Sequence, residues 1–486
     1  MAERSDLLKR NNSKKIYLLT GILLLFFLNT VLSSAEVKNN LNADTLNVAS
    51  ISKTHLQQPP IYMIAPFVIL LLAIATGPLF YKHHWEKHYG KYSILLAVIV
   101  AGYYVFVLNE FSGLQKTITE YISFIALMTS LFVVASGILI NVDRKATPIV
   151  NTLFLLIGAV LANFIGTTGA SVLLIKPFIK LNKDRIATYH IIFFIFIISN
   201  VGGALTPLGD PPLFLGFLSG VPFFWVVQHM WYMWILALIL ILIPFYFFDL
   251  LNRKSSDKQQ YSGKIEIKGH KNMIFLLVII LAVFIDPSVF HWVPDFSPLP
   301  FGLREIIMFA VVYFAYKGSD QKILKANEFN FEPIKEVAFL FLGIFITMLP
   351  ALELVAIEAK TLGNKLNADV FYWATGALSS VLDNTPTYMN FLSAAMGKYY
   401  LDVAIKAHVQ HFVSVDIIYL EAISISAVLF GAMTYIGNGP NFMVKSISER
   451  AGITMPSFFA YIFKYSLLVL LPAYTIIWLL FFYGRG

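Results

Sequence analysis

Two aspartates lie in short polar stretches that interrupt strongly apolar sequence. Asp383 belongs to Leu-Asp-Asn-Thr-Pro-Thr (Leu382–Thr387), and Asp210 belongs to Gly-Ala-Leu-Thr-Pro-Leu-Gly-Asp-Pro-Pro (Gly203–Pro212). A carboxylate at membrane depth costs about 2.5–3.5 kcal/mol on insertion scales, so it usually serves a function. Na⁺ and other hard cations bind several oxygens, and a carboxylate shielded from water can hold a proton instead. The two stretches therefore predict a site that takes either a cation or a proton.

The second of these stretches has a copy later in the chain. Gly431–Pro440 reads Gly-Ala-Met-Thr-Tyr-Ile-Gly-Asn-Gly-Pro and is identical to the first copy at five of ten positions. Asn438 takes the place of Asp210 and would bind a cation through its amide oxygen. A Thr-Thr-Gly-Ala-Ser stretch (Thr167–Ser171) likewise mirrors the polar residues at 383–387. The candidate cation ligands are Asp383, Asn384, Thr385, Thr387, Asp210, Asn438, Thr167, Thr168, Ser171, Thr206, Thr434 and Asn200.

Each candidate also has a purely structural interpretation. Asp383 could cap the helix that follows it, and Asp210 could stabilise a Gly-Asp-Pro-Pro turn. Hydroxyl groups such as that of Thr167 often bond to the preceding turn of their own helix. A turn at membrane depth is itself unusual, however, because polar backbone survives there only where it lines a cavity or is buried in protein. We therefore expect a binding role for the set.

The elements that position these residues follow from glycine, proline and apolar length. Glycine and proline at the spacings found in the ten-residue stretches cannot continue a helix, so each stretch predicts a broken transmembrane helix. The stretches at 167–171 and 382–387 each separate two short apolar runs, which predicts helical hairpins at 150–179 and 370–396. A matched pair of breaks in two halves of a chain is typical of a transporter binding site. No catalytic or dinucleotide motif is present, so we expect neither an enzyme nor a cofactor.

Composition indicates a protein embedded in a lipid bilayer. Of the 486 residues, 58% are apolar and 13% are charged, and the mean hydropathy is +0.71. The chain is long enough for roughly a dozen spans. Its net charge of +8 comes largely from Lys and Arg in short loops, which is a pattern of membrane topology rather than of nucleic-acid binding. The absence of cysteine excludes disulfides and thiolate metal sites.

The chain divides into five parts. Residues 1–35 have the charged, apolar and small-residue regions of a signal peptide and fit an uncleaved first transmembrane helix equally well. Residues 36–60 are predicted to form a polar periplasmic tail. Two membrane halves, 61–248 and 273–486, flank a basic cytoplasmic linker at 249–272.

The two halves are predicted to be repeats of inverted topology. Thr167 and Asp383 are 216 residues apart and Gly203 and Gly431 are 228 apart, so two interruptions recur in the same order at nearly the same separation. With the N-terminus in the cytoplasm, the loops assigned inside hold 26 of the 36 Lys and Arg residues, as the positive-inside rule requires. The hairpins then enter from opposite sides of the membrane. The predicted fold is an all-α polytopic membrane protein with a re-entrant hairpin and a broken helix in each repeat.

Together, the four interrupted motifs resemble those of the ion transporter superfamily. The similarity is greatest to NhaD-type sodium/proton antiporters and their citrate-transporter-like relatives, and it extends over nearly all of the chain after residue 61. It implies a homodimer in the inner membrane, in which a part that holds both hairpins moves as an elevator against a scaffold. It also implies a cation site formed by Asp383, Asn384 and the Thr167–Ser171 tip, with Asp210 and Asn438 in the broken helices.

Two functions fit this sequence. The first is exchange of Na⁺ or Li⁺ for H⁺, because the four interruptions carry two carboxylates and no Lys or Arg. The second is cation- or proton-coupled transport of citrate or another organic anion, because helix N-termini alone can hold a carboxylate. The motifs depart from both relatives: Pro211 and Pro212 stand where NhaD-type antiporters carry hydroxyl-rich residues, and neither hairpin has the Ser-Asn-Thr tip of sodium/dicarboxylate carriers. A channel or sensor is disfavoured, because inverted hairpins suit alternating access.

Overall fold

A computed structural model describes residues 58–252, 263–287, 292–296 and 299–485. The predicted signal peptide or first helix at 1–35 lies outside these residues, as do most of the tail and the middle of the predicted linker. The described chain is mostly helical, and seven of its helices are long and apolar enough to cross a membrane. The prediction of a multi-pass membrane protein is therefore confirmed.

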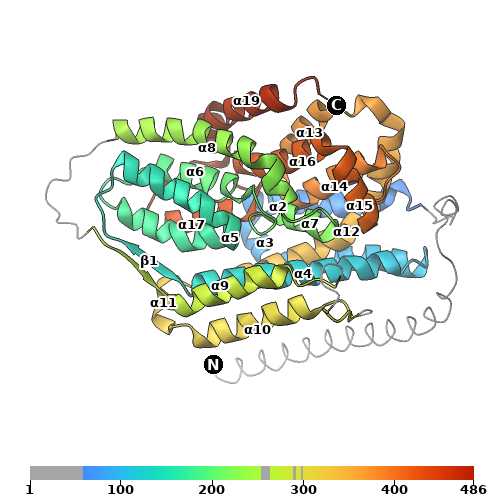
Figure 1. Ribbon diagram of the computed structural model, residues 1–486, viewed down its shortest axis with the longest axis horizontal. Coiled ribbons are helices and arrows are strands. Elements are labelled where there is room, and N and C mark those ends of the chain that lie inside the picture. Colours follow the sequence, from blue (N-terminus) through green and yellow to red (C-terminus); the bar gives the residue numbers. More distant parts are fainter. Residues whose placement is uncertain (1–57, 253–262, 288–291, 297–298, 486) are drawn as a thin grey trace.

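The first half begins with three long apolar helices and then reaches the interrupted segments (Figure 1). Outside the interrupted segments, the long apolar helices of this half are α2, α3, α4 and α8. The elements are η2 (Ile61–Ile64), α2 (Ala65–Phe80), α3 (Lys82–Phe106), α4 (Ser112–Ser136), β1 (Leu139–Val142), α5 (Pro148–Leu181), α6 (Thr188–Ile197), η3 (Val201–Gly203), α7 (Pro211–Ser219) and α8 (Trp225–Leu251).

The second half contains a further series of helices, of which α11 and α15 are short. It ends with a continuous helical run from α18 to α19, in which η6 is π-helical. The elements are β2 (Ile265–Lys268), α9 (His270–Val283), α10 (Leu303–Gly318), α11 (Gln321–Ala326), α12 (Glu332–Leu362), η4 (Gly363–Lys365), α13 (Ala368–Val381), α14 (Asn384–Gly397), α15 (Lys406–Val415), α16 (Ile417–Phe430), η5 (Gly431–Met433), α17 (Gly439–Arg450), α18 (Phe458–Tyr461), η6 (Ile462–Leu470) and α19 (Leu471–Phe481).

Helix α5 consists of two antiparallel arms. Gly166 has φ 73° and ψ 154°, a conformation that glycine adopts readily and other residues rarely. Asn151 and Asn182 exchange side-chain hydrogen bonds of 2.8 and 3.0 Å, although 31 residues of straight helix would place them about 46 Å apart. The chain therefore folds back at Gly166, as the predicted hairpin requires. The prediction of an interruption at Thr167–Ser171 was wrong in detail, because these residues form the first turn of the second arm.

The helices α13 and α14 form the second hairpin. Only two residues stand between them, so Asn384–Thr387 belong to the first turn of α14 rather than to an extended break. At the open end of this hairpin, Lys398 donates a 2.9 Å hydrogen bond to the backbone oxygen of Leu366. The offset of 216 residues carries Asn182 onto Lys398. Each hairpin is therefore tied at its open end, and one residue of each tie, Asn182 or Lys398, occupies the same position at this offset.

The two ten-residue stretches end one helix and begin another. Asp210 (φ −143°, ψ 141°) and Asn438 (φ −150°, ψ 139°) are the N-caps of α7 and α17 and share nearly the same extended backbone. Pro212 and Pro440 occupy the second helical position, where proline lacks the N–H group that an N-cap side chain would bind. Neither N-cap side chain bonds to its own helix. Both side chains are therefore available to bind other elements.

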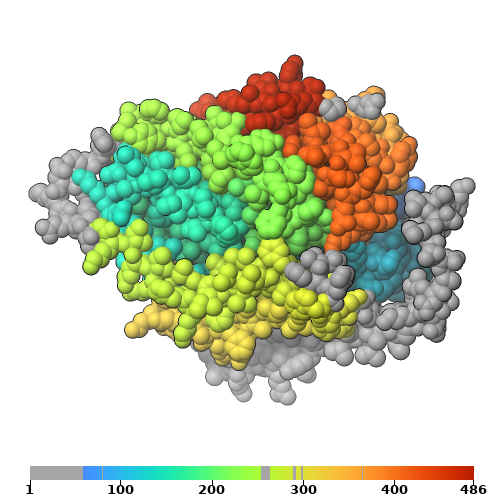
Figure 2. Space-filling model, in the orientation of Figure 1, coloured from blue at the N-terminus to red at the C-terminus, as the bar shows by residue number. Residues whose placement is uncertain are grey.

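The helix α12 lies between two groups of helices. It packs against α3 and α4 on one side and against α14 of the second hairpin on the other, while α9 and α10 extend the layer of α4 (Figure 1). The remaining interrupted elements pack on one another across the two halves of the chain. Figure 2 shows the green α7–α8 segment directly against orange residues of the second half, where α7 and α8 contact α16.

The predicted linker at 249–272 is more structured than a loop. Its strand β2 pairs antiparallel with β1, with Leu139 opposite Lys268, so the described chain is not purely helical. Asp249, assigned to the linker from sequence, is instead buried near the end of α8. It pairs with Arg185 at 2.6 Å and with His190 at 2.8 Å. This buried ion pair ties the segment after the first hairpin to α8, and losing one partner would leave a buried charge uncompensated.

Candidate functional site

Asp210 is fully buried (0% exposed) and lies where the four interrupted elements meet. The Thr167 hydroxyl donates to its Oδ1 at 2.8 Å, and Asn438 Nδ2 donates to the same oxygen at 3.0 Å. Asn384 Nδ2 donates to Oδ2 at 2.5 Å. These donors come from the first hairpin, the second broken helix and the second hairpin, while Asp210 itself begins α7. One carboxylate therefore joins both hairpins and both broken helices.

Four helices begin at this carboxylate: the second arm of α5, α7, α14 and α17. Each helix N-terminus carries a partial positive charge, so the local field stabilises the negative charge of Asp210. Its hydrogen-bond donors are themselves neutral hydroxyl and amide groups. In the described part of the chain, no group of three or more His, Asp or Glu side chains could hold a metal ion. The candidate ligands are accordingly one buried carboxylate with neutral oxygens around it.

Asp383 lies outside this hydrogen-bond network. Its side chain is half-buried, and its Oδ1 accepts a 2.9 Å hydrogen bond from the backbone N–H of Thr385, which caps α14. The Thr387 hydroxyl donates to the backbone oxygen of Asp383 at 2.9 Å. The family resemblance implied a cation site formed by Asp383, Asn384 and the Thr167–Ser171 tip, with Asp210 in a broken helix beside them. The structure places Asp383 in the capping position and puts Asp210 at the centre of the network.

Thr206 and Thr434 bind the two breaks to the two hairpins in the same manner. Thr206 Oγ1 donates to the backbone oxygen of Asn163 at 2.5 Å, and Thr434 Oγ1 donates to that of Ser380 at 2.6 Å. Each hydroxyl also accepts a 3.1 Å hydrogen bond from the N–H of the glycine three residues later. Because their hydroxyl hydrogens are already used, these threonines shape the backbone of the breaks rather than face the carboxylate.

Asn200 carries a buried oxygen without a partner. Its Nδ2 donates to Asn441 Oδ1 at 2.7 Å and to the backbone of α6 at 2.8 Å, whereas its Oδ1 has no hydrogen-bond partner among the described residues. This oxygen lies 3.1 Å from the place where a Cβ on residue 431 would stand, so Gly431 permits its close approach. A buried unpaired amide oxygen is costly. It is available as a ligand for a cation.

Three polar residues of the site were missed by the sequence analysis. Asn441 joins Asn200 to the second break, Ser199 Oγ lies 2.7 Å from the predicted Ser171 Oγ, and Asn163 Oδ1 accepts a hydrogen bond from the first break at 2.9 Å. The Asn438 amide also donates to the backbone oxygen of Ser199 at 3.2 Å. Asn200 was predicted from its position three residues before Gly203. An asparagine within or next to apolar sequence, as at Asn163 and Asn441, is a further signal that could have identified these residues.

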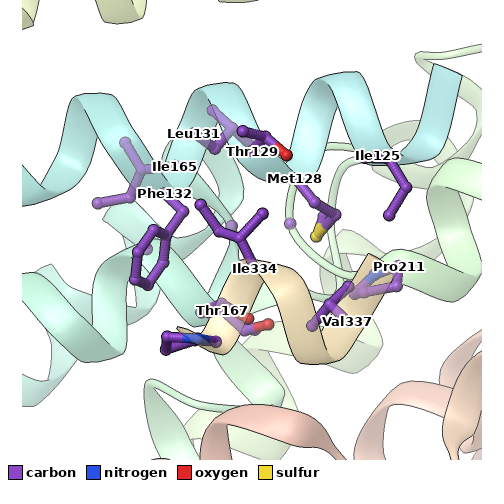
Figure 3. A pocket seen from close by; sticks show the side chains of 15 residues that line it. Ile125, Met128, Thr129, Leu131, Phe132, Ile165, Thr167, Pro211, Ile334 and Val337 are labelled. Carbon is purple, nitrogen blue, oxygen red and sulfur yellow. The ribbon is translucent and has the colours of Figure 1, made fainter. Parts of the chain in front are cut away.

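An apolar cavity of about 50 Å³ adjoins the first hairpin tip (Figure 3). Thr167, Thr168 and Pro211 of the interrupted elements, Met128 of α4 and Ile334 of α12 are among the residues that line it. No charged side chain lines this cavity. Thr168, a predicted ligand, lines this apolar gap between the hairpin and α4 and α12, and the side-chain hydrogen bonds to Asp210 come from Thr167, Asn384 and Asn438 instead.

Comparison with known proteins assigns the chain to a family. A family model described as "Putative citrate transport" matches residues 56–482, which include every residue of the candidate site. No curated protein matches the chain.

Proposed function

The chain belongs to the citrate transport family, and on this premise we propose that it is a secondary active transporter that exchanges Na⁺ or Li⁺ for H⁺. The observation that carries the proposal is the buried carboxylate of Asp210, which accepts hydrogen bonds from three other interrupted elements. An ion that binds Asp210 changes the contacts of both hairpins and both broken helices at once. Ion binding at such a point is suited to drive a change of conformation.

In this mechanism Asp210 alternates between a cation and a proton. Without a cation, its carboxylate accepts hydrogen bonds from Thr167, Asn384 and Asn438. A half-turn of either amide would present its oxygen instead of its nitrogen, and hard cations prefer several such oxygens. The unpaired Asn200 oxygen would complete this set. A proton on Asp210 removes the negative charge that holds the cation, so Na⁺ and H⁺ compete, as exchange requires.

Asp383 would attract the cation as it approaches Asp210. It directly precedes Asn384, and its carboxylate is half-buried, whereas that of Asp210 is fully buried. A negative charge at the hairpin tip would attract a cation before the cation reaches the deeper carboxylate. This role is compatible with its hydrogen bond to the backbone N–H of Thr385.

We further propose that the two halves are inverted repeats and that the interrupted elements move together as an elevator in the inner membrane. The corresponding ties at the open ends of both hairpins support the repeat, as do the matched bonds of Thr206 and Thr434. The apolar cavity between the first hairpin and α4 and α12 supports relative movement, because its lining has no charged contact to break. The homodimer implied by the family resemblance belongs to this proposal.

A second candidate function is ion-coupled transport of citrate or another organic anion, which the description of the family favours. The four helix N-termini at the site would supply partial positive charge for a substrate carboxylate in the absence of Lys or Arg. Asp210 and Asp383 would then bind the coupling ion.

Purified protein in liposomes with an acidic interior and a trapped pH dye separates the two candidates. Antiport predicts that NaCl or LiCl raises the internal pH and that KCl does not. Organic-anion transport predicts a response that requires sodium citrate. If none of the four salts changes the internal pH, both proposals are refuted. Addition of a protonophore is the control, because it must still collapse the pH gradient in the same liposomes.

A further inference from the structure

A basic pocket of about 230 Å³ lies at the end of the molecule that carries α11 and β1, on the left in Figure 1. It is formed by the end of α5, the end of α17 and the loop between α11 and α12. Two isoleucines and an alanine provide an apolar part of its lining. Its lining residues are Lys176, Ile179, Lys180, Lys183, Glu328, Ile447, Arg450 and Ala451.

Glu328 shows that the basic pocket attracts an oxyanion. Its Oε1 lies 3.0 Å from Lys176 Nζ, and its Oε2 lies 3.9 Å from Arg450. Glu328 has φ 54°, a left-handed conformation that is uncommon for residues other than glycine. The hydrogen bond from Lys176 lowers the pKa of the Glu328 carboxyl, so this group is ionised at neutral pH. Because Glu328 is 60% exposed, an external anion can compete with it.

One carboxylate does not neutralise four cations. Lys180 donates to the side-chain oxygen of Asn141 at 2.7 Å, which is a neutral group. For Lys183, the residues that the structure describes provide no carboxylate in an ion pair. Three of the cations stand at or just beyond the end of the apolar helix α5, a candidate membrane span, and Arg450 ends the more polar helix α17 beside it. The end of a membrane span is the depth at which lipid phosphates lie. The apolar lining beside them is suited to the glycerol region of a lipid.

We propose that the basic pocket binds the phosphate group of an anionic phospholipid. The phosphate pairs with Lys180 and Lys183 and competes with Glu328 for Lys176 and Arg450. Since Glu328 belongs to the α11–α12 loop while its partners belong to α5 and α17, the bound lipid also releases an ionic contact between this loop and those helices. The proposal concerns a site remote from Asp210 and does not depend on which ion or anion the protein transports.

The test is a titration of the full-length protein in neutral detergent with phosphatidylglycerol, followed by native mass spectrometry. The double variant Lys180→Ala/Lys183→Ala should bind the lipid about thirtyfold more weakly, since each lysine near the phosphates contributes roughly fivefold. Glu328→Gln removes the competing carboxylate and should bind the lipid up to about fivefold more tightly. The matched control is Lys264→Ala/Lys268→Ala, which removes the same charge from β2 and the residue before it and should leave the affinity unchanged.

The variants change affinity in opposite directions, so a loss of folding cannot imitate the expected result. Equal lipid affinity in wild type, the Lys180→Ala/Lys183→Ala variant and Glu328→Gln would overturn the proposal, as would an equal loss in the control. Inorganic phosphate is titrated in parallel by thermal shift. Phosphate, and not phosphatidylglycerol, could bind the Lys180→Ala/Lys183→Ala variant more weakly and Glu328→Gln more tightly than wild type. This result would overturn the lipid proposal and identify the pocket as a site for dissolved phosphate.

Discussion

Pro212 leaves Asp210 free to serve the candidate site, and restoring an N–H group at this position should weaken ion binding. Asp210 is the N-cap of α7, and an N-cap carboxylate normally accepts a hydrogen bond from the second or third helical N–H. Pro212 provides no N–H at the second position, and Asp210 makes no side-chain bond to its own helix. The carboxylate bonds to Thr167, Asn384 and Asn438 instead.

Pro212→Ala places a new donor beside this carboxylate. An N-cap hydrogen bond contributes about 1 kcal/mol, with a range of roughly 0.5–2 kcal/mol, and a cation must displace it in order to bind. The Na⁺ concentration for half-maximal exchange should therefore rise about fivefold, within bounds of roughly twofold to thirtyfold. The stability of α7 should not fall, because alanine is the best helix former and gains a backbone donor here.

The assay is the Na⁺ dependence of proton release from liposomes with a trapped pH dye. Pro211→Ala is the matched control, because it makes the same chemical change at the first helical position, whose N–H is not the usual partner of an N-cap side chain. An unchanged Na⁺ dependence in Pro212→Ala would refute the reasoning. An equal shift in both variants would assign the effect to backbone freedom rather than to the new donor.

Three further predictions test the same arrangement. Asp210→Asn should abolish Na⁺/H⁺ exchange, because asparagine cannot carry the proton and because the lost unit charge, about 4 Å from the cation, contributes about 4 kcal/mol at an effective dielectric constant of 20. In the same liposome assay Asp383→Asn should slow exchange at low Na⁺ concentration yet retain a stable α14, because the attracting charge is lost while asparagine is an equally good N-cap. Normal exchange by either variant would remove that residue from the site. Thr434→Val should lower the free energy of unfolding by about 1–3 kcal/mol through the lost bonds of the break, whereas Thr434→Ser should not, and equal thermal stability of the two variants would contradict the bridging role. Asp249→Asn should destabilise the protein by about 3–5 kcal/mol by leaving Arg185 charged and buried, and an unchanged melting temperature would show that this ion pair contributes little.

Much of the fold was predictable because it depends on local sequence. Apolar runs of about 20 residues predicted the spans, and glycine and proline predicted the four interruptions, because a chain in lipid has few alternatives to a helix. The hairpin at Gly166 and the breaks before α7 and α17 appear where these residues stand, within one or a few positions. The strands β1 and β2 were not predicted, since pairing between segments so far apart in sequence leaves little local signal.

The candidate site was predictable as a set of residues but not as an arrangement. The sequence by itself determined that polar and acidic residues interrupt the membrane at four places, because such residues are too costly there to be incidental. Only the tertiary structure decided which carboxylate lies at the centre. Asp383 accepts a hydrogen bond from the backbone N–H of Thr385 on its own helix, whereas Pro212 has no N–H group that could donate to Asp210. Asp210 therefore takes its partners from helices that begin as far as 228 residues away, and only the folded chain brings them together.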